Sequence, residues 1–262
     1  MTVIVYEHPL SPYAQKVKIA LDEKGVAYEA KMPVAIGSGQ PDRDFLKSNP
    51  RGEVPSLIDG EAAIFDSTII LEYIEDKWPH PPLLPKSPLA RAQARTIEEV
   101  MDTSFEPINW GLGEIKWFKR AAGERARAIE ARAAAQARGL YEWLTRELDG
   151  REWFGGDAFG WADLSVVPYL NGARGNRIGP DESSALGKWL ARANARPSVA
   201  KSANAAMAVA ASMTQVHAAI ESGMFKREYR DHRLEWMIRS GGLDVVLEGI
   251  EKGNIRFSNE LR

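Results

Sequence analysis

Ser11 stands directly before Pro12, where a strand-like run gives way to a helix-like pattern. Serine is a preferred helix N-cap, and proline is a preferred first helical residue because its missing N–H would have no partner there. The pair therefore predicts a helix start. A hydroxyl at a helix N-terminus is also well placed to hold an anion, because the helix dipole and the free N–H groups favour negative charge.

The sequence contains no cysteine among its 262 residues. It therefore offers no disulfide, no thiolate metal ligand and no thiol nucleophile of its own. We expect no metal site, because the spacing of metal ligands is absent from the four histidines, His8, His80, His217 and His232. If a thiol takes part in the chemistry, a ligand must bring it.

The charges nearly balance, since 34 Lys and Arg residues stand against 36 Asp and Glu residues, for a net charge of -2 at pH 7. This balance gives no support for a nucleic-acid partner or an anionic membrane. The first residues lack the basic start and apolar core of a signal peptide, and no apolar run approaches membrane-spanning length. We therefore expect a soluble cytoplasmic protein.

The elements that must position Ser11 alternate between strands and helices up to about residue 78. Strand-like runs, amphipathic segments and a hairpin turn at Asp59-Gly60 follow one another in the order β-α-β-α-β-β-α. The expected strands are residues 3–6, 28–34, 54–59 and 60–66, and the expected helices are residues 15–24, a short one within 38–50, and 66–78.

Residues 79–88, "PHPPLLPKSP", form a proline-rich break, which predicts a linker because proline does not fit inside helices. The pattern then turns helical, and Pro197 is expected to break it. The segment "MFKREYRDHRLEWMIRSGGLDVVLEGI" near the end is too apolar for a solvated tail. The expected helical segments are residues 89–119, as one or two helices, 124–148, 161–175, 183–194 and an alanine-rich run at 200–211.

Four segments in this order resemble a cytosolic glutathione transferase: "SPYAQKVKIALDEKGVAYE", "NPRGEVPSL", "FDSTIILEYIED" and "DAFGWADLSVVPYL". The match covers roughly residues 1–197 and is closest to serine-type, bacterial-like members with omega-like and β-etherase-like features. It implies a fold of the class α/β plus all-α. A thioredoxin-like glutathione-binding domain would span residues 1–80, a linker 81–88, and an all-helical domain 89–262 with a C-terminal extension from about residue 213.

The resemblance also implies an activity, namely the conjugation of glutathione, the co-substrate, to an electrophilic apolar or aromatic small molecule in detoxification. The family is usually dimeric, across helices three and four, so we expect a homodimer in which the apolar residues Ile69 and Trp78 of the third helix are available for the contact. A glutathione-dependent lyase of the β-etherase type, a dehalogenase and a non-catalytic interaction module remain alternatives. Omega-like members carry cysteine where Ser11 stands, so mixed-disulfide chemistry by the protein itself is excluded here.

Ser11 is the expected catalytic residue, as the donor of a hydrogen bond to the glutathione sulfur. A thiol has an ordinary pKa of about 8.5, and lowering that pKa by two units takes about 2.7 kcal/mol. One hydrogen bond to a charged group contributes roughly 1.5–3 kcal/mol, and a helix N-terminus adds about 0.3–1 kcal/mol. A serine hydroxyl is therefore sufficient. Tyr6 and Tyr13 are rivals for the role, although Tyr6 fits strand packing better.

Val54, Pro55, Asp66 and Ser67 are the glutathione-binding residues that the resemblance implies. A cis Val54–Pro55 bond would turn the main chain of Val54 toward the cysteinyl part of glutathione; the alternative is an ordinary trans proline at an edge strand. Asp66 and Ser67 would meet the γ-glutamyl ammonium and carboxylate, or they simply cap a helix. Arg43 and Arg51 are interpreted as surface charges rather than as partners of the glycyl carboxylate.

The second-substrate pocket is expected at Tyr13, Trp110 and Tyr229. We expect the C-terminal extension to fold back over its mouth, with the basic run that includes Arg233 over acidic residues of the third helix or over an anionic substrate. Packing on the far side of the helical domain is the alternative. Asp163 resembles the acid of a capping box, but Gly160 supplies no hydroxyl, so Asp163 is expected to be structural.

Overall fold

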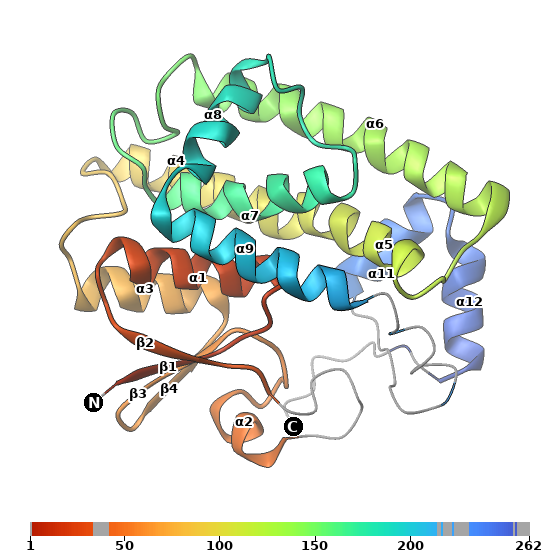
Figure 1. Ribbon diagram of the computed structural model, residues 1–262, viewed down its shortest axis with the longest axis horizontal. Coiled ribbons are helices and arrows are strands. Elements are labelled where there is room, and N and C mark those ends of the chain that lie inside the picture. The colour runs from red at the N-terminus through yellow and green to blue at the C-terminus, as the bar shows by residue number, and fades with distance from the viewer. Residues whose placement is uncertain are drawn as a thin grey trace.

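The computed structural model describes residues 2–33, 42–213, 216, 222, 231–253 and 255. Its sheet has the strand order β2-β1-β3-β4, in which β2 runs parallel to β1 whereas β3 and β4 are antiparallel to their neighbours. Helices α1 and α3 cover one face of the sheet and α2 lies on the other (Figure 1). The bounds are β1 Val3–Tyr6, α1 Pro12–Glu23, β2 Tyr28–Lys31, α2 Arg43–Ser48, β3 Ser56–Asp59, β4 Ala62–Phe65 and α3 Ser67–Lys77.

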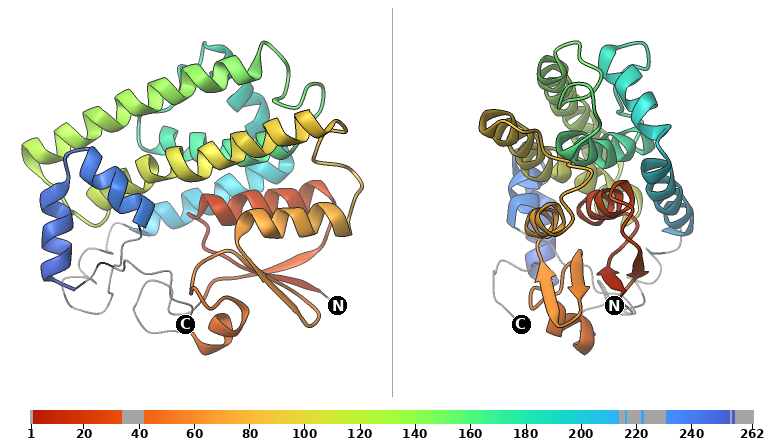
Figure 2. Two further views of the ribbon diagram at one scale, coloured as in Figure 1. Left: turned by 180° about the vertical axis from the view of Figure 1, so that it is seen from behind. Right: turned by 90° about the vertical axis from the view of Figure 1, so that its left-hand side faces the viewer.

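All helices and strands that the structure describes beyond residue 87 are helices. The expected order of a thioredoxin-like domain followed by an all-helical domain is therefore confirmed. The helical domain packs on the side of α1 and α3 that faces away from the sheet (Figure 2). None of the described helices is long and apolar enough to cross a membrane. The bounds are α4 Pro88–Val100, a π-helical turn Met101–Phe105, α5 Glu106–Lys116, α6 Gly123–Leu148, α7 Trp161–Gly175, α8 Ala185–Asn194, α9 Pro197–Ser212, α11 Asp231–Arg239 and α12 Leu243–Glu251.

Helix α1 is the element that both layers share, because it packs against α3, α7 and α9. It begins where the sequence predicts, with Ser11 as the N-cap and Pro12 as the first helical residue. Both sides of α1 are therefore buried, and Val17 and Leu21 are completely inaccessible. In α3 the inner face is formed by Ile70, Leu71 and Ile74, whereas Ile69, expected on that face, points outward with 56% of its surface exposed.

The linker after α3 is bound to both domains. The Glu75 carboxylate of α3 accepts hydrogen bonds from the N–H groups of Leu83 and Leu84, and it pairs with the ammonium of Lys24 at 2.8 Å. The carbonyl oxygen of Leu83 in turn accepts the N–H of Trp161, the first residue of α7. The proline-rich segment therefore holds a fixed position.

The same contact explains why glycine stands at position 160. A Cβ atom there would lie 2.5 Å from the carbonyl oxygen of Leu83, so no serine or threonine fits. Asp163 accepts the N–H of Gly160 and of Phe154, and the indole N–H of Trp189, which confirms its expected structural role. The Leu83 carbonyl of the linker thus binds one of the free N–H groups at the start of α7, that of Trp161, where no hydroxyl is present at position 160.

The C-terminal region departs from the expected pattern at Pro197. Pro197 was expected to break the helical pattern, but it opens α9 as the first helical residue, a position that tolerates proline. Helix α11 then packs against α5, where the ring of Trp236 fills the space above Gly111; a Cβ on Gly111 would lie 1.9 Å from that ring. Trp236 also donates its indole N–H to the side chain of Gln136 in α6 at 2.6 Å.

Candidate functional site

A cavity of about 520 Å³ lies between the first domain and the beginning of the helical domain. Its walls come from the first turn of α1, the segment before β3, the start of α3 and the junction of α4 with the π-helical turn. The expected site residues Tyr13, Val54, Pro55, Asp66 and Ser67 are all part of these walls. The other lining residues are Asn49, Arg51, Glu53, Phe65, Thr68, Arg95, Glu98, Glu99, Asp102 and Thr103.

Ser11 lies at the N-terminus of α1, two residues before the cavity wall at Tyr13, and is not itself a lining residue. Its Oγ accepts the N–H of Ala14 at 3.3 Å, which is the predicted capping bond. Within the described ranges, no acceptor takes the Ser11 hydroxyl hydrogen. The side chain can therefore cap the helix and still donate one hydrogen bond.

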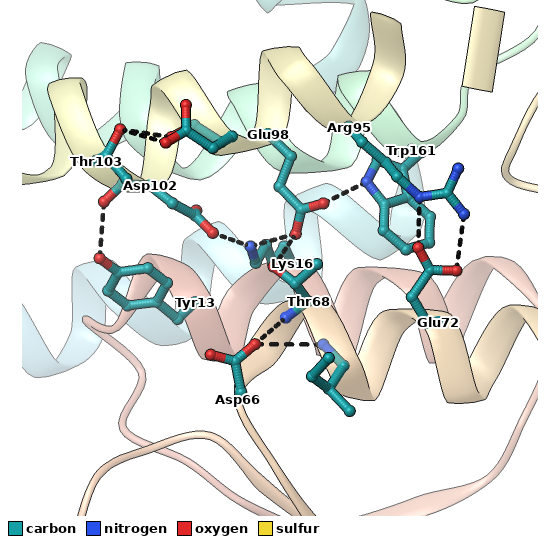
Figure 3. Close-up of polar contacts among 12 residues, drawn as sticks. Tyr13, Lys16, Asp66, Thr68, Glu72, Arg95, Glu98, Asp102, Thr103 and Trp161 are labelled. Atoms are coloured by element: carbon teal, nitrogen blue, oxygen red, sulfur yellow. Dashed lines mark hydrogen bonds and ion pairs between the residues drawn. The ribbon is translucent and has the colours of Figure 1, made fainter. Parts of the chain in front are cut away.

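The two tyrosines near Ser11 have different environments. Tyr13 donates its hydroxyl hydrogen to the main-chain carbonyl of Asp102 at 2.9 Å, so that donor is already engaged (Figure 3). This contact favours the role of a cavity wall over that of a sulfur donor. Tyr6 packs its ring against Phe45 with the centroids 5.2 Å apart, as expected for a residue that packs within a strand.

Asp66 and Ser67 open α3 at the edge of the cavity. Asp66 is the N-cap, with Oδ1 accepting the N–H groups of Thr68 and Ile69, and its φ of 76° is a left-handed value that residues other than glycine rarely adopt. Strain of this kind gathers at ligand sites. Ser67 is buried, and its hydroxyl has no hydrogen-bond partner among the residues that the structure describes.

The Val54–Pro55 bond is cis, as the resemblance implied, and both residues line the cavity. A second cis bond, His80–Pro81, was not expected. Arg51 also lines the cavity, with its guanidinium 3.9 Å from the Asp66 carboxylate and 5.4 Å from the ring centroid of Phe65.

Trp110, expected in the second-substrate pocket, is not a lining residue of this cavity. Trp110 is half-buried in α5, where it packs against a second hydrophobic core formed by α5, α6 and the extension. Tyr229 lies outside the described residues. Arg43 is exposed at the start of α2, consistent with a surface charge.

A buried ionic cluster forms the floor of the cavity (Figure 3). Lys16 of α1 is completely inaccessible and pairs with Glu98 at 2.6 Å and Asp102 at 2.5 Å. Further donors satisfy the carboxylates: Thr68 and Trp161 donate to Glu98, and Tyr169 donates to Asp102. The cluster therefore joins α1, α3, α4, α7 and the π-helical turn.

The cluster contains two carboxylates and one ammonium in a site that water barely reaches. Burial alone would lower the pKa of Lys16, but the charges of Asp102 and Glu98 outweigh it and the pKa is raised. Burial raises the pKa of Asp102, and the charge of Lys16 opposes this effect. Lys16 is therefore held in its charged form, and Asp102 is the carboxyl group that takes up a proton more readily than usual.

Sequence reasoning missed this cluster, although one signal was present. Lys16 follows Tyr13 by three residues and precedes Ala20 by four, so it lies on the face of α1 that the apolar residues occupy. A lysine on such a face needs a partner. Glu98 and Asp102, spaced by four residues on one helical face, are suitable acids.

Comparison with known proteins agrees with this geometry. Residues 5–82 match the family model of the glutathione S-transferase N-terminal domain, and residues 124–194 match that of the C-terminal domain. Glutathione S-transferase Z2 of Arabidopsis thaliana is 41% identical over 171 residues, which cover 64% of this chain and 75% of that protein. The chain belongs to the cytosolic glutathione transferase family.

Two further comparisons agree with the family assignment. A stringent starvation protein A homolog of Pasteurella multocida is 31% identical over 180 residues, 68% of this chain and 77% of that protein. The crystal structure of rice GST1 in complex with glutathione superimposes with a TM-score of 0.69 at 26% identity, covering 83% of this chain and 99% of that one. The match to the C-terminal domain model ends at residue 194, before α9 and the extension.

Proposed function

We propose that the protein is a glutathione transferase that conjugates glutathione to an electrophilic, apolar or aromatic small molecule. One observation carries the proposal: Val54 and Pro55 bound the same cavity as Asp66 and Ser67 at the start of α3. Main-chain groups, a helix N-terminus and a carboxylate then stand together, which are the partners that a peptide with carboxylate and ammonium groups needs.

We assign Ser11 as the hydrogen-bond donor to the sulfur of glutathione. Its hydroxyl donates to the thiolate, which lowers the pKa of the glutathione thiol, and the thiol proton leaves to solvent. The thiolate then attacks the electrophilic carbon, a carbon–sulfur bond forms, and the leaving group, such as halide, departs with the bonding electrons. Asp66 meets the γ-glutamyl ammonium, and Ser67 with the α3 N-terminus meets its carboxylate.

A second candidate is a non-catalytic glutathione transferase-like module. It is favoured by the likeness to stringent starvation protein A homologs, whose name states no transferase activity. The lyase and dehalogenase alternatives use the same thiolate and differ only in the electrophile. Retention of Asp66 and Ser67 at the cavity, with Ser11 at the N-terminus of α1 two residues before the cavity wall, supports the transferase.

The assembly and the location complete the proposal. We propose a cytoplasmic homodimer, with the exposed Ile69 of α3 at the contact; Trp78, the other expected contact residue, packs half-buried against Tyr73 of its own chain. The proposed domain limits are 1–80 and 89–262, joined by the linker 81–88. Sedimentation at micromolar concentration tests the dimer, and a monomer mass would contradict it.

Turnover of 1-chloro-2,4-dinitrobenzene, with retention on immobilised glutathione, tests the activity. Ser11→Ala should lower kcat/KM by roughly 10- to 100-fold at neutral pH, the value of one charge-assisted hydrogen bond, and the deficit should shrink above about pH 9, where the thiol ionises unaided. Ser87→Ala is the matched control, because Ser87 caps α4 through the same kind of bond, to Ala90, without facing the cavity. Neither binding nor turnover in the wild type would favour the non-catalytic module.

A further inference from the structure

The extension brings a cation to the beginning of α5. Arg233 of α11 donates from Nε and Nη2 to the same oxygen, Oε1 of Glu106, at 3.0 and 2.6 Å. Its guanidinium also lies 5.7 Å from the ring centroid of Trp110. The sequence predicted that the basic run of the extension lies over acidic residues of α3 or over an anionic substrate. For Arg233 the α3 pairing is wrong, because its partner is Glu106 of α5; Lys226, Arg227 and Arg230 lie outside the described residues.

Among the residues that the structure describes, acceptors meet only one side of this guanidinium. A guanidinium has five N–H donors, and Glu106 receives two of them on one oxygen. In the described part of the chain no acceptor meets Nη1, and 14% of the Arg233 side chain stays accessible. One N–H of Nη1 and the second N–H of Nη2 point in parallel from the end of the guanidinium. These two donors match the two oxygens of a second carboxylate.

Arg233 also lies close to the walls of the cavity. Burial alone would lower the pKa of Arg233, but the charge of Glu106 and smaller contributions from Tyr13 and Glu53 raise it. Tyr13 and Glu53 both line the cavity. Glu106 directly follows the π-helical turn, whose Asp102 and Thr103 line the cavity as well. Arg233 is not itself a lining residue, but its partner Glu106 directly follows the π-helical turn, so the cation lies next to the end of the cavity that this turn forms.

Its position is held by strong packing rather than by the ion pair alone. Trp236, one turn along α11, fills the space above Gly111, and Met237 is completely buried. Arg233 is thus presented by an anchored helix, which costs little ordering when a ligand binds.

Resting on the proposed function, we propose that Arg233 is a specificity-determining residue that binds a carboxylate at this end of the cavity. An electrophile with a carboxylate is one source of that group, and the glycyl end of glutathione is the other. Glu106 competes with the ligand for the guanidinium, so it sets how much of the cation is available.

The test compares 4-chloro-3-nitrobenzoate with its methyl ester as electrophiles. Arg233→Gln should lower the ratio of kcat/KM for acid over ester by about tenfold, the effect of one charge-assisted hydrogen bond. Glu106→Gln should raise that ratio, because it removes the competing carboxylate. Arg239→Gln is the matched control, since Arg239 lies on the same helix and, among the described residues, pairs with exposed Glu235. If Arg233→Gln and Glu106→Gln shift the acid-over-ester ratio in the same direction, or if neither shifts it, the electrophile is not the source of the bound carboxylate.

The second arm measures KM for glutathione and for glutathione with its glycyl carboxylate converted to an amide. If Arg233→Gln raises KM for glutathione but not for the amide, the bound carboxylate is the glycyl one. If neither arm responds, the proposal is overturned.

Two further measurements keep the test independent of folding and of turnover. The double variant Arg233→Gln with Glu106→Gln leaves no unpaired buried charge, and it should lose the preference for the acid while its unfolding midpoint stays near that of the wild type. If the wild type turns over neither electrophile, the proposed function fails. Calorimetric binding of 4-chloro-3-nitrobenzoate and of glutathione then tests Arg233 directly: weaker binding of either one by Arg233→Gln supports the proposal, and equal binding of both ligands by the two proteins overturns it.

Discussion

Tyr13 and Asp102 are joined by a hydrogen bond of 2.9 Å from a phenol to a main-chain carbonyl, across 89 residues of sequence. The acceptor belongs to the π-helical turn, in which the N–H of Glu106 donates to the carbonyl of Met101, five residues back. π-Helical turns concentrate at functional sites because they re-aim side chains. Here the turn exposes a carbonyl to Tyr13 and directs Asp102 toward Lys16.

Tyr13→Phe should therefore act on stability rather than on the sulfur. Loss of one hydrogen bond that leaves a half-buried carbonyl unpaired should cost about 1 kcal/mol of unfolding free energy, measured by urea denaturation. The pKa of glutathione bound to the variant, followed by thiolate absorbance, should match that of the wild type. An upward shift of that pKa would instead make Tyr13 a sulfur donor.

Lys16→Met should be strongly destabilising at neutral pH. It leaves Glu98 and Asp102 as buried carboxylates without their cation, and breaking such a pair typically costs about 3–5 kcal/mol. In the variant the folded-state pKa values of these carboxyls rise above their unfolded values, so the variant's stability should fall as pH increases. Urea unfolding at pH 5 and pH 8 should show the smaller loss at pH 5.

The matched control for that variant is Lys201→Met. Lys201 pairs with Asp22 on the surface, with 62% of its side chain exposed, so its removal should cost less than about 1 kcal/mol. Equal losses for Lys16→Met at the two pH values would show that packing, not charge, dominates at position 16.

The raised pKa of Asp163 predicts that its contribution to stability changes with pH in the direction opposite to that of a carboxylate with a lowered pKa. Burial raises the pKa of Asp163 from 3.8 to about 6, against hydrogen bonds from Phe154, Trp189, Gly160 and its own main chain that lower it. The folded state thus holds a proton that the unfolded state has lost, and stability should fall as pH rises through that window, by at most about 3 kcal/mol. Unfolding measured from pH 4 to 7 should show this slope, and Asp163→Asn should flatten it, whereas Asp181→Asn, on the surface, should not.

Gly111→Ala should loosen the extension. Its Cβ would overlap the ring of Trp236, so α11 must shift, at a typical cost of about 1–3 kcal/mol for overpacking. Limited proteolysis should then cut the chain after α9 faster than in the wild type. Gly139→Ala is the control, because a Cβ at that helical position meets nothing within 4 Å and should stabilise α6 slightly.

The parts of the structure that sequence reasoning anticipated depend on local signals. The Ser11 cap, the hairpin at Asp59-Gly60 and the Asp66 cap each follow from a few neighbouring residues, and the structure confirms all three. Pro197 was misjudged because a proline both ends and begins helices, and only the neighbours in space decide which applies.

The parts that were missed depend on residues far apart in the chain. Lys16 meets Glu98 across 82 residues, and Arg233 meets Glu106 across 127. Each sequence signal alone, a lysine on an apolar face or an arginine in a basic run, is compatible with a solvated side chain. Gly160 was interpreted as a missing hydroxyl, since nothing in the sequence places the Leu83 carbonyl beside it.

The hydrogen bonds of residues 83 and 84 matter for anyone who recombines this protein with a relative. A chimera that joins a foreign helical domain directly after α3 would keep the Glu75 carboxylate but replace residues 83 and 84, whose N–H groups it binds. A crossover between Pro85 and Ser87 keeps those bonds within one parent, but it separates Leu83 from Trp161, whose N–H the Leu83 carbonyl accepts. Gly160 and the linker should therefore be inherited together, because a parent with serine at position 160 requires a different path for residue 83.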